Sequence, residues 1–462
     1  MSSPRFTAAL MAGKLCAVFC RAFFPKRGSN LPGRFALKLD PLFLRRVKGI
    51  DPARTIFITG TNGKSTANNT VVHTFQAAGL SVCSNLEGAN MKPGAASALI
   101  KNTTLSGHFT KEFLILEIDE RSLSLISKDL RPGHLCVTNI QKDQVQRNGE
   151  PDYIYQKIKA VVGEIDGLTL YLNNDEPRAL SLGGVSDLSS RDERVGKCRI
   201  RTFGVAPNER ASETEAVWGV TMPCPICHDA LVFTHFNLAG VGAFRCPACG
   251  FRPKAEPDVL VSGVDFENLT FNVSDRTYRL AYQAAFFLYN YALCACVCAE
   301  FGVGEAALEQ AFATFTNISG RMETFSYAGK TIKYMRIKQE NPETLQSALD
   351  TIAEDKTIKA FVLGPAIVDD IIPHYSNTFY TFDCNFEPFM RSGIERCICF
   401  GSAIGWDTAN RLRYAGIPDE RIEIVDTDDD EKILAAIAAC ETKNIYLITW
   451  IKKYEKLKAH SA

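Results

Sequence analysis

Apolar and polar positions along residues 55–182 predict strands of a parallel sheet that alternate with helices. Thr55 to Ile58 is a continuous apolar run, typical of a strand buried on both faces. Three later runs, each followed or ended by polar or acidic residues, have the same character: 113–119, 134–139 and 168–175. Ligands bind at the carboxyl edge of such sheets, so the pattern predicts a doubly wound α/β domain that binds nucleotide.

A second α/β pattern begins beyond Gly320–Glu323, which we expect to be a domain junction. Its strand-like runs, separated by helical stretches, are 360–364, 396–401, 422–425 and 444–449. They predict a Rossmann-like domain, although the Gly-x-Gly-x-x-Gly turn is absent from the sequence. Before the junction, Tyr278 to Phe301 is predicted to be one long apolar helix.

Three regions are therefore expected. Residues 1–50 form a basic segment, whose helical part is expected to end near Leu31–Gly33. Residues 51–317 form the nucleotide-binding domain, with a polar, weakly patterned stretch at 183–221. Residues 318–462 form the Rossmann-like domain.

The turn after the first strand carries residues suited to phosphate. Its two glycines let backbone N–H groups approach a phosphate, and the helix that follows adds partial positive charge. Lys64 would neutralise the β- and γ-phosphates, and Ser65 or Thr66 would offer a hydroxyl to Mg²⁺. The general P-loop has one more glycine upstream, so this loop is a shorter form, and a turn without nucleotide is the alternative. The predicted nucleotide-binding residues of the loop are Gly60, Thr61, Asn62, Gly63, Lys64, Ser65 and Thr66.

Two Cys-x2-Cys pairs predict a zinc ribbon at about residues 222–254. Cys224 and Cys227 form the first pair, and Cys246 and Cys249 follow after eighteen residues. Two thiolates in a tight turn occupy two corners of a tetrahedron, and a second turn completes it. Four protein ligands leave no open position, so the zinc is expected to be structural. Two disulfides or four free thiols are the alternative.

The formal net charge is zero, which provides no global field for nucleic acid, but the charge is uneven. Residues 1–50 carry ten basic residues against one acid, Asp40, and Asp426–Glu431 is an acidic run. Both can be solvated faces. The basic segment can instead contact an anionic membrane surface or a phosphate-rich substrate.

No window contains about 18–20 uninterrupted apolar residues, so no transmembrane segment is expected. The sixteen cysteines are interpreted mainly as reduced core thiols, because the chain is large and no signal peptide is recognisable. We expect a cytoplasmic protein, with a peripheral position at the inner membrane face as an option.

Several linked motifs together resemble one family, the MurT-type subunits of lipid II isoglutaminyl synthase, within the Mur ligase superfamily. The inserted four-cysteine ribbon distinguishes this family from ordinary Mur ligases. The other motifs are Gly60–Thr66, Gly88–Met91, Glu117–Glu120, Thr138–Asn139, Asp143–Gln144, Arg147–Glu150 and Gly320–Glu323. The resemblance implies ATP-dependent amidation of the α-carboxylate of D-glutamate in the lipid II stem peptide. It also implies a separate GatD-type glutaminase that supplies ammonia.

The resemblance implies roles for individual residues. Lys64 and Mg²⁺ would hold the transferring phosphoryl group, with Ser65 and Glu120 or Glu117 near the metal; strand-end acids without a metal are the alternative. Asn290 corresponds to a position near the adenine, although a hydrogen bond between helices would also explain it. Arg321 and Asn341 are further nucleotide candidates.

Asp383 corresponds to an aspartate that orients the glutaminase histidine across the subunit interface, and a carboxylate can do so by accepting an imidazole N–H. A strand-end aspartate without this role is the alternative. The segment around it departs most from the family pattern, since Asn385 replaces a second acid.

Three functional hypotheses follow. The first is the synthetase subunit just described, and the lack of a class I glutaminase signature in this chain favours a heterodimer. The second is a stand-alone Mur-like ligase that adds an amino acid to a cell-wall precursor. The third is a nucleotide-binding scaffold without turnover.

Overall fold

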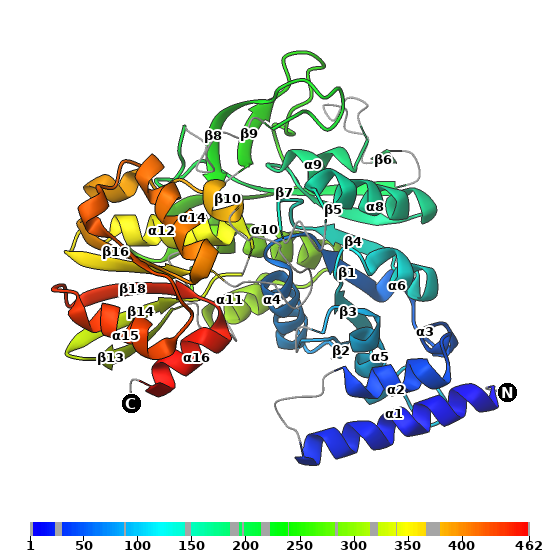
Figure 1. Cartoon of the computed structure of the whole chain (residues 1–462). Coiled ribbons are helices and arrows are strands. Elements are labelled where there is room, and N and C mark those ends of the chain that lie inside the picture. The colour runs from blue at the N-terminus through cyan, green and yellow to red at the C-terminus, as the bar shows by residue number, and fades with distance from the viewer. Residues whose placement is uncertain are drawn as a thin grey trace. The chain divides into compact units, whose positions relative to one another are not determined.

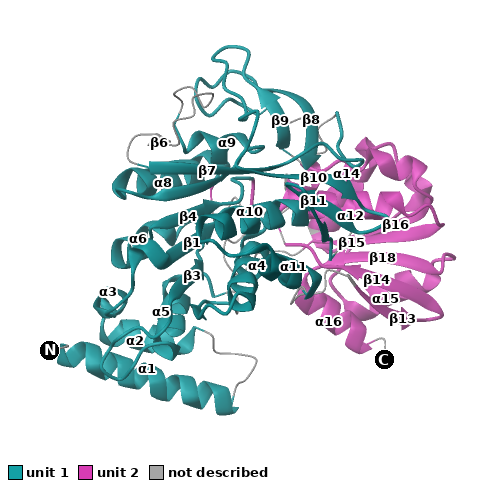
Figure 2. Cartoon of the chain, turned by 180° about the vertical axis from the view of Figure 1, so that it is seen from behind, with its two compact units in different colours: residues 1–141, 150–214, 222–316 teal, residues 142–149, 215–221, 317–462 magenta. Residues whose placement is uncertain are grey.

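The computed structural model contains two compact units, which are described separately (Figure 2). Unit 1 comprises residues 1–141, 150–214 and 222–316, and unit 2 comprises 142–149, 215–221 and 317–462. The residues whose structure is described are 3–23, 30–86, 89–143, 149–184, 194–195, 198–213, 222–238, 240–281, 285–314, 322–338, 340–365 and 379–460. The domain boundaries expected at residues 50 and 317 stay a prediction.

Unit 1 is built on a ten-stranded sheet of order β12-β11-β10-β7-β5-β4-β1-β3-β2, with β6 paired to β7. The strands from β2 to β10 along this order are parallel, and β6, β11 and β12 are antiparallel to their neighbours. The bounds are β1 Thr55–Thr59, β2 Val82–Cys83, β3 Phe113–Glu117, β4 His134–Val137, β5 Thr169–Asn173, β6 Arg194–Val195, β7 Cys198–Val205, β10 Val259–Asp265, β11 Thr270–Val273 and β12 Arg276–Arg279.

Helices cover both faces of this sheet, as the doubly wound prediction requires (Figure 1). Ile56 and Ile58 of β1 pack on one side with α4, α10 and α11, whereas Phe57 packs on the other with α5, α6 and α8. The bounds are α4 Lys64–Ala77, α5 Lys92–Lys101, α6 Leu123–Leu130, α8 Pro151–Glu164, α9 Pro177–Ser181, α10 Phe286–Glu300 and α11 Glu305–Thr314. The alternation along β1 explains the continuous apolar run, because each face of the strand meets a helical layer.

Three further helices, α1 (Pro4–Phe23), α2 (Leu31–Leu39) and α3 (Phe43–Arg46), join the core cluster beneath α5. Gly33 brings α2 against α5, since a Cβ there would collide with the backbone carbonyl of Pro93. The expectation that the helical segment ends near Leu31 was wrong. Pro32 stands in the first turn of α2, where proline is favoured because its missing N–H has no helical partner.

The expectation that no segment spans a membrane stays a prediction. Among the described residues one helix, α1, is long and apolar enough to cross a membrane by length and composition alone. Arg5, Lys14 and Arg21 are the three charged residues among the twenty of α1, and the remainder of the helix is mostly apolar.

The zinc ribbon forms as predicted in outline. β8 (Val232–Leu238) and β9 (Val241–Arg245) make an antiparallel hairpin between the two cysteine turns. A small hydrophobic cluster contains the ribbon residues Leu231, Phe244, Phe251, Cys224 and Cys246 together with Leu180 of α9.

Unit 2 is a six-stranded sheet of order β13-β14-β18-β15-β16-β17, parallel except for the β13–β14 hairpin. Helices α12, α13 and α14 pack on one face, and α15 and α16 on the other. The bounds are β13 Met322–Tyr327, β14 Lys330–Met335, β15 Lys359–Gly364, β16 Ile394–Phe400, β17 Ile422–Val425, β18 Asn444–Thr449, α12 Pro342–Glu354, α13 Phe379–Phe382, α14 Ser402–Tyr414, α15 Asp430–Ala439 and α16 Ile451–His460. The four strands predicted here are present, and the Rossmann-like fold is confirmed.

Candidate functional site

The loop between β1 and α4 has the backbone geometry of a phosphate cradle. Gly60 and Gly63 have φ values of 124° and 82°, a region that favours glycine. A Cβ at Gly60 would collide with the side chain of Thr138, and one at Gly63 would lie 2.6 Å from Asn290 Oδ1. Both glycines are therefore required by conformation and by space. No side chain caps α4, whose N-terminus follows Gly63 and favours an anion there.

The segment after β4 braces this loop. Asn139 accepts from the Thr61 N–H through its backbone oxygen (2.8 Å) and from the Asn62 N–H through Oδ1 (2.8 Å). Thr138 Oγ1 donates to the Asn62 carbonyl at 2.7 Å, and Gln141 accepts from Asn62 Nδ2 at 3.0 Å. The sequence did not predict that Asn139 and Gln141 brace the loop, because amide residues in an irregular segment show no periodic pattern.

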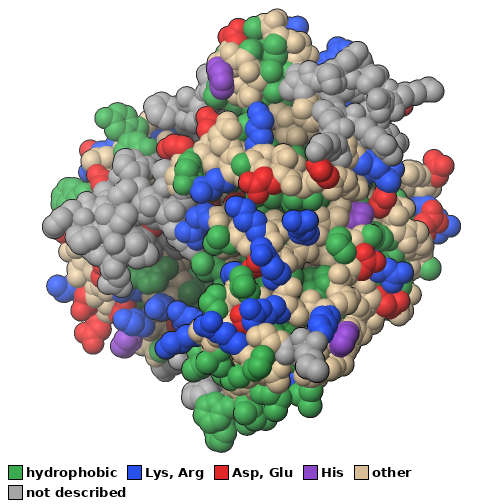
Figure 3. Space-filling view, turned by 90° about the vertical axis from the view of Figure 1, so that its right-hand side faces the viewer, with side chains coloured by type: hydrophobic (Ala, Val, Ile, Leu, Met, Phe, Trp, Pro, Cys, Tyr) green, Lys and Arg blue, Asp and Glu red, His purple; other side chains and the backbone are tan. Residues whose placement is uncertain are grey.

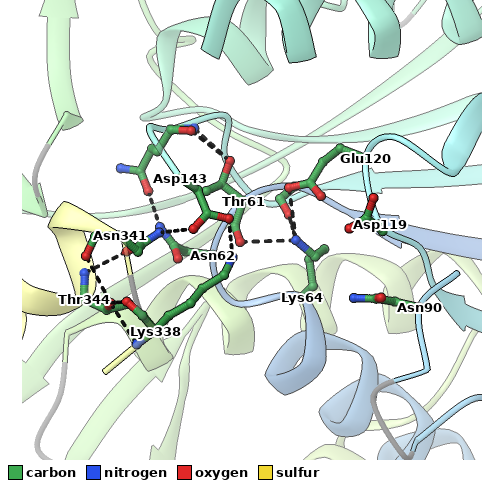
Figure 4. A network of polar contacts seen from close by, with 12 residues as sticks. Thr61, Asn62, Lys64, Asn90, Asp119, Glu120, Asp143, Lys338, Asn341 and Thr344 are labelled. Atoms are coloured by element: carbon green, nitrogen blue, oxygen red, sulfur yellow. Dashed lines mark hydrogen bonds and ion pairs between the residues drawn. The ribbon is translucent and has the colours of Figure 1, made fainter. Parts of the chain in front are cut away.

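Lys64 is buried at the start of α4 and its ammonium group faces the loop. Nζ donates to the carbonyls of Gly60 and Thr61 and lies 3.0 Å from Glu120 Oε1 (Figure 4). Glu120 is itself buried, 6% exposed, so the two charges compensate each other away from water. This ion pair links the helix that follows β1 to the acidic end of β3, and it was not predicted from the sequence.

The other acids after β3 have different partners. Glu117, also buried, accepts from Asn90 Nδ2 at 3.0 Å, and Asp119 pairs with Arg121 at 3.2 Å. Carboxylates and hydroxyls are suitable ligands for Mg²⁺, and Glu117, Glu120 and the exposed Ser65 supply them on the phosphate side of the sheet. Asp119 is held in a local turn by Arg121 and is the weakest candidate of the three acids.

Asn290 lies in α10 and is 3% exposed. Its Nδ2 donates to the carbonyl of Phe286 one turn earlier, and its Oδ1 faces Gly63. The side chain therefore lies against the phosphate loop, which agrees with a nucleotide-binding role and with its alternative as a structural amide.

The four ribbon cysteines form a compact ligand set. Their Sγ atoms all lie within 4.8 Å of one another, with 3.7 Å between Cys224 and Cys249 and 3.4 Å between Cys227 and Cys246. A tetrahedral zinc thiolate site places sulfurs about 3.8 Å apart, so the set fits zinc. A hydrogen bond from the backbone N–H of Cys249 to the Cys246 sulfur lowers the pKa of the Cys246 thiol to about 7. None of the sixteen cysteines forms a disulfide.

Unit 2 holds a separate polar cluster near the start of α12. Asp143 pairs with Lys338 and accepts from Asn341 Nδ2 at 3.2 Å (Figure 4). Asn341 also caps α12, because its Oδ1 accepts from the Thr344 N–H at 2.9 Å. Asn341 therefore has a structural role as the cap of α12, and its contact with nucleotide stays a prediction.

Asp383 follows α13 and is not an unpaired carboxylate. Its Oδ2 lies 2.7 Å from Lys142 Nζ within the same unit. Nearby Glu343 has a buried Oε2 without a hydrogen-bond partner among the described residues. Burial, together with the charges of Asp143 and Asp383, raises the pKa of Glu343 to about 8. Gly88, Gln144, Arg147, Gly320 and Arg321 lie outside the described residues.

Comparison with known proteins bears on most of the chain. The family "MurT ligase C-terminal" matches residues 339–451. The MurT subunit of lipid II isoglutaminyl synthase (glutamine-hydrolyzing) from Staphylococcus aureus strain COL is 28% identical over 379 residues, covering 82% of this chain and 81% of that protein. Its counterpart from Streptococcus pneumoniae is 28% identical over 432 residues, covering 91% and 90%. Over most of its length the chain is therefore similar to MurT subunits.

Solved structures show that the chain has the fold of Mur ligases. A pseudomurein peptide ligase type C from Methanothermus fervidus superposes with a TM-score of 0.64 at 18% identity, covering 89% of this chain and 79% of that one. MurF ligase from Thermotoga maritima in complex with ADP gives 0.56 at 14% identity, covering 92% and 84%. The predicted fold, and the resemblance to MurT-type subunits, are confirmed.

Proposed function

We propose that this chain is the synthetase subunit of an amidotransferase that converts the D-glutamate α-carboxylate of the lipid II stem peptide to D-isoglutamine. The similarity to MurT subunits over most of the chain and the Mur ligase fold support a ligase. The observation that carries the proposal is the buried Lys64–Glu120 pair at a glycine loop, because this arrangement suits transfer of a phosphoryl group from ATP.

The reaction takes place in two balanced steps. A carboxylate oxygen of the substrate attacks the γ-phosphorus of ATP, the bond to the β-phosphate oxygen breaks, and ADP leaves. Ammonia then attacks the carbonyl carbon of the acyl phosphate, loses a proton, and inorganic phosphate departs. A free carboxylate is a poor electrophile, so activation as an acyl phosphate is what the ATP contributes.

The chain's own residues position and neutralise the transferring group. Lys64 releases the loop carbonyls and binds phosphate oxygens, so its charge offsets the negative charge of the nucleotide. The backbone held by Gly60 and Gly63 approaches the phosphates, and Asn290 lies beside it. Ser65 and Glu120, with Glu117 close by, would hold Mg²⁺, which withdraws charge from the β- and γ-phosphates when bound.

Other assignments within this proposal concern structure and assembly. Zinc would hold the ribbon through its four cysteines, without an open ligand position. Ammonia would come from a GatD-type glutaminase bound to the region 318–462. Asp383 would then have to exchange Lys142 for the glutaminase histidine. Arg321 and Asn341 are proposed as further nucleotide contacts.

The test is amidation of purified lipid II with ATP, Mg²⁺ and ammonium, with the lipid product analysed by mass spectrometry. The proposal expects a product in which a hydroxyl has been replaced by an amino group. Lys64→Ala should abolish it, and Lys128→Ala, which changes an exposed lysine on α6, should leave it unchanged.

Each alternative has its own outcome. A product heavier by an amino-acid residue, once amino acids are supplied, would establish the stand-alone ligase instead. Nucleotide binding without any lipid product, even after a candidate glutaminase is added, would establish the scaffold.

A further inference from the structure

Helix α1 is apolar on two opposite sides, and only one of them is covered. Phe6 and Leu10 are 1% and 0% exposed and belong to the core of unit 1. Leu15, Val18 and Phe23 lie on the other side and are 68%, 68% and 66% exposed. A solvated helix ordinarily carries polar residues on its outer face, so the outer face of α1 is the exception that needs an explanation.

The neighbouring helix α2 repeats the pattern. Leu31, Phe35 and Leu39 recur at the spacing of one helical face and are 40%, 51% and 43% exposed. The two helices are antiparallel neighbours, because Arg5 Nε at the start of α1 donates to the Leu39 carbonyl at the end of α2, 2.6 Å away.

These side chains form one concentrated patch, here called the apolar face. Nine of the twenty exposed large hydrophobic side chains among the described residues fall within residues 11–42. Figure 3 shows hydrophobic side chains gathered at the lower end of the molecule, where α1 lies, with lysines and arginines above them. The apolar face comprises Met11, Leu15, Val18, Phe19, Phe23, Leu31, Phe35, Leu39 and Leu42. Monomeric proteins rarely expose such a patch unless it binds something.

The charge around the apolar face is strongly basic. Residues 1–50 contain ten lysines and arginines and a single acid, Asp40. Asp40 is buried and paired with Arg46 at 2.7 Å, so it does not offset the exposed charge. Arg34 and Lys38, one turn apart and both exposed, flank the apolar stripe of α2. An equally basic second copy would be repelled, whereas an anionic surface is complementary.

The packing of α1 favours a helix that lies along a surface. Phe6 stacks on Phe43 with ring centroids 5.3 Å apart, and Lys14 Nζ donates to the Ile100 carbonyl at 2.9 Å. Ile100 packs against Gly13, where there is no side chain; a Cβ at Gly13 would lie only 2.6 Å from Ile100 Cδ1. A helix crossing a bilayer would lose these contacts, although its length and composition would permit it.

We propose that α1 and α2 dock this chain on an anionic phospholipid bilayer, with the apolar face inserted at the headgroup boundary and the basic side chains on lipid phosphates. Exposed aliphatic and aromatic side chains flanked by lysine and arginine are the composition of an interfacial helix. This inference stands on the surface of α1 and α2 alone and does not need the proposed reaction.

Flotation of the full chain with vesicles tests the docking. We expect binding to phosphatidylglycerol–phosphatidylcholine vesicles, weaker binding to pure phosphatidylcholine, and a decrease with added salt. Leu15→Gln with Phe19→Gln should reduce binding at least about tenfold. The variant lacks the favourable free energy of transferring the leucine and phenylalanine side chains from water into lipid. Arg34→Gln with Lys38→Gln should remove most of the preference for the anionic lipid.

The matched control changes two exposed aliphatic side chains elsewhere, Leu260→Gln with Ile358→Gln, and should bind vesicles like the wild type. The proposal is overturned if no vesicle binds or if Leu15→Gln with Phe19→Gln binds unchanged. Light scattering that detects a dimer dependent on Leu15 and Phe19 without lipid would overturn it in favour of a second copy. Retention in the membrane after alkaline carbonate extraction would overturn it in favour of a spanning helix.

A second readout separates this inference from the proposed function. The Leu15→Gln, Phe19→Gln variant should amidate a water-soluble, short-chain lipid II analogue at the wild-type rate and vesicle-embedded lipid II more slowly. Vesicle binding without amidation of either substrate would remove the proposed reaction and leave the docking intact.

Discussion

At the scale of the residue, the phosphate loop was predictable because its chemistry is local. Gly60, Gly63 and Lys64 stand within five consecutive positions, and the structure gives the glycines positive φ and buries the lysine. The partner of Asp383 was not predictable, because Lys142 is distant in the sequence and only the fold of unit 2 brings the two together. Local motifs therefore predicted the conformation of the loop, whereas the ion pair of Asp383 depends on the tertiary fold.

Glu343 provides a test at the same scale. The pKa of this carboxyl is raised from 4.5 to about 8, mainly by burial. The folded state thus holds the proton more tightly than the unfolded state, so the stabilisation is fully present below about pH 4.5 and is lost as the pH approaches 8. Glu343→Gln should flatten the fall in unfolding temperature between about pH 4.5 and about pH 8, measured by calorimetry.

The control for this measurement is Glu441→Gln, which changes an exposed glutamate of the same unit and should keep the wild-type pH profile. A Glu343→Gln profile parallel to the wild type would show that the carboxyl does not titrate in this range.

At the scale of the element, prediction succeeded where one strand meets two helical layers. The eight strands expected in the two sheets are present, because buried parallel strands are continuous apolar runs. The β13–β14 hairpin was missed, since its turn uses Ala328 and Gly329, both with positive φ, in place of the usual Asn-Gly signal. The predicted helix from Tyr278 was wrong at its start: β12 ends at Arg279, and α10 begins at Phe286.

Strand β7 was missed for a related reason. Residues 183–221 were expected to be weakly patterned, yet Cys198–Val205 pairs with β5 in the middle of the sheet. Arg199 and Arg201 break the apolar run, and Glu300 pairs with both of them. From the sequence alone these arginines look solvent-exposed, because their partner Glu300 lies on α10, far along the chain.

The ribbon provides a test at the scale of the element. Its core contains few large side chains besides the cysteines, so bound zinc should supply much of its stability. Cys246→Ser with Cys249→Ser should lower the zinc content from about one ion per chain to nearly none, measured by plasma mass spectrometry. Limited proteolysis should then cut within residues 222–254 at least about tenfold faster.

Cys16→Ser with Cys384→Ser is the control, because neither thiol belongs to the ribbon. Zinc at the wild-type level after removal of both Cys246 and Cys249 would mean that the metal is bound elsewhere.

At the scale of the whole molecule, the two units have separate cores, and the predicted nucleotide ligands of the phosphate loop all belong to unit 1. A ligand that binds the folded state alone stabilises it by about 2.7 kcal/mol at a concentration of 100 times its dissociation constant. MgADP should therefore raise the unfolding temperature of the wild-type chain. Lys64→Ala should lose most of this shift, because the ammonium group that faces the loop carbonyls is the local counter-charge for phosphate. Lys128→Ala should keep it, and an equal shift in Lys64→Ala would place the nucleotide outside the β1–α4 loop, whatever reaction the chain catalyses.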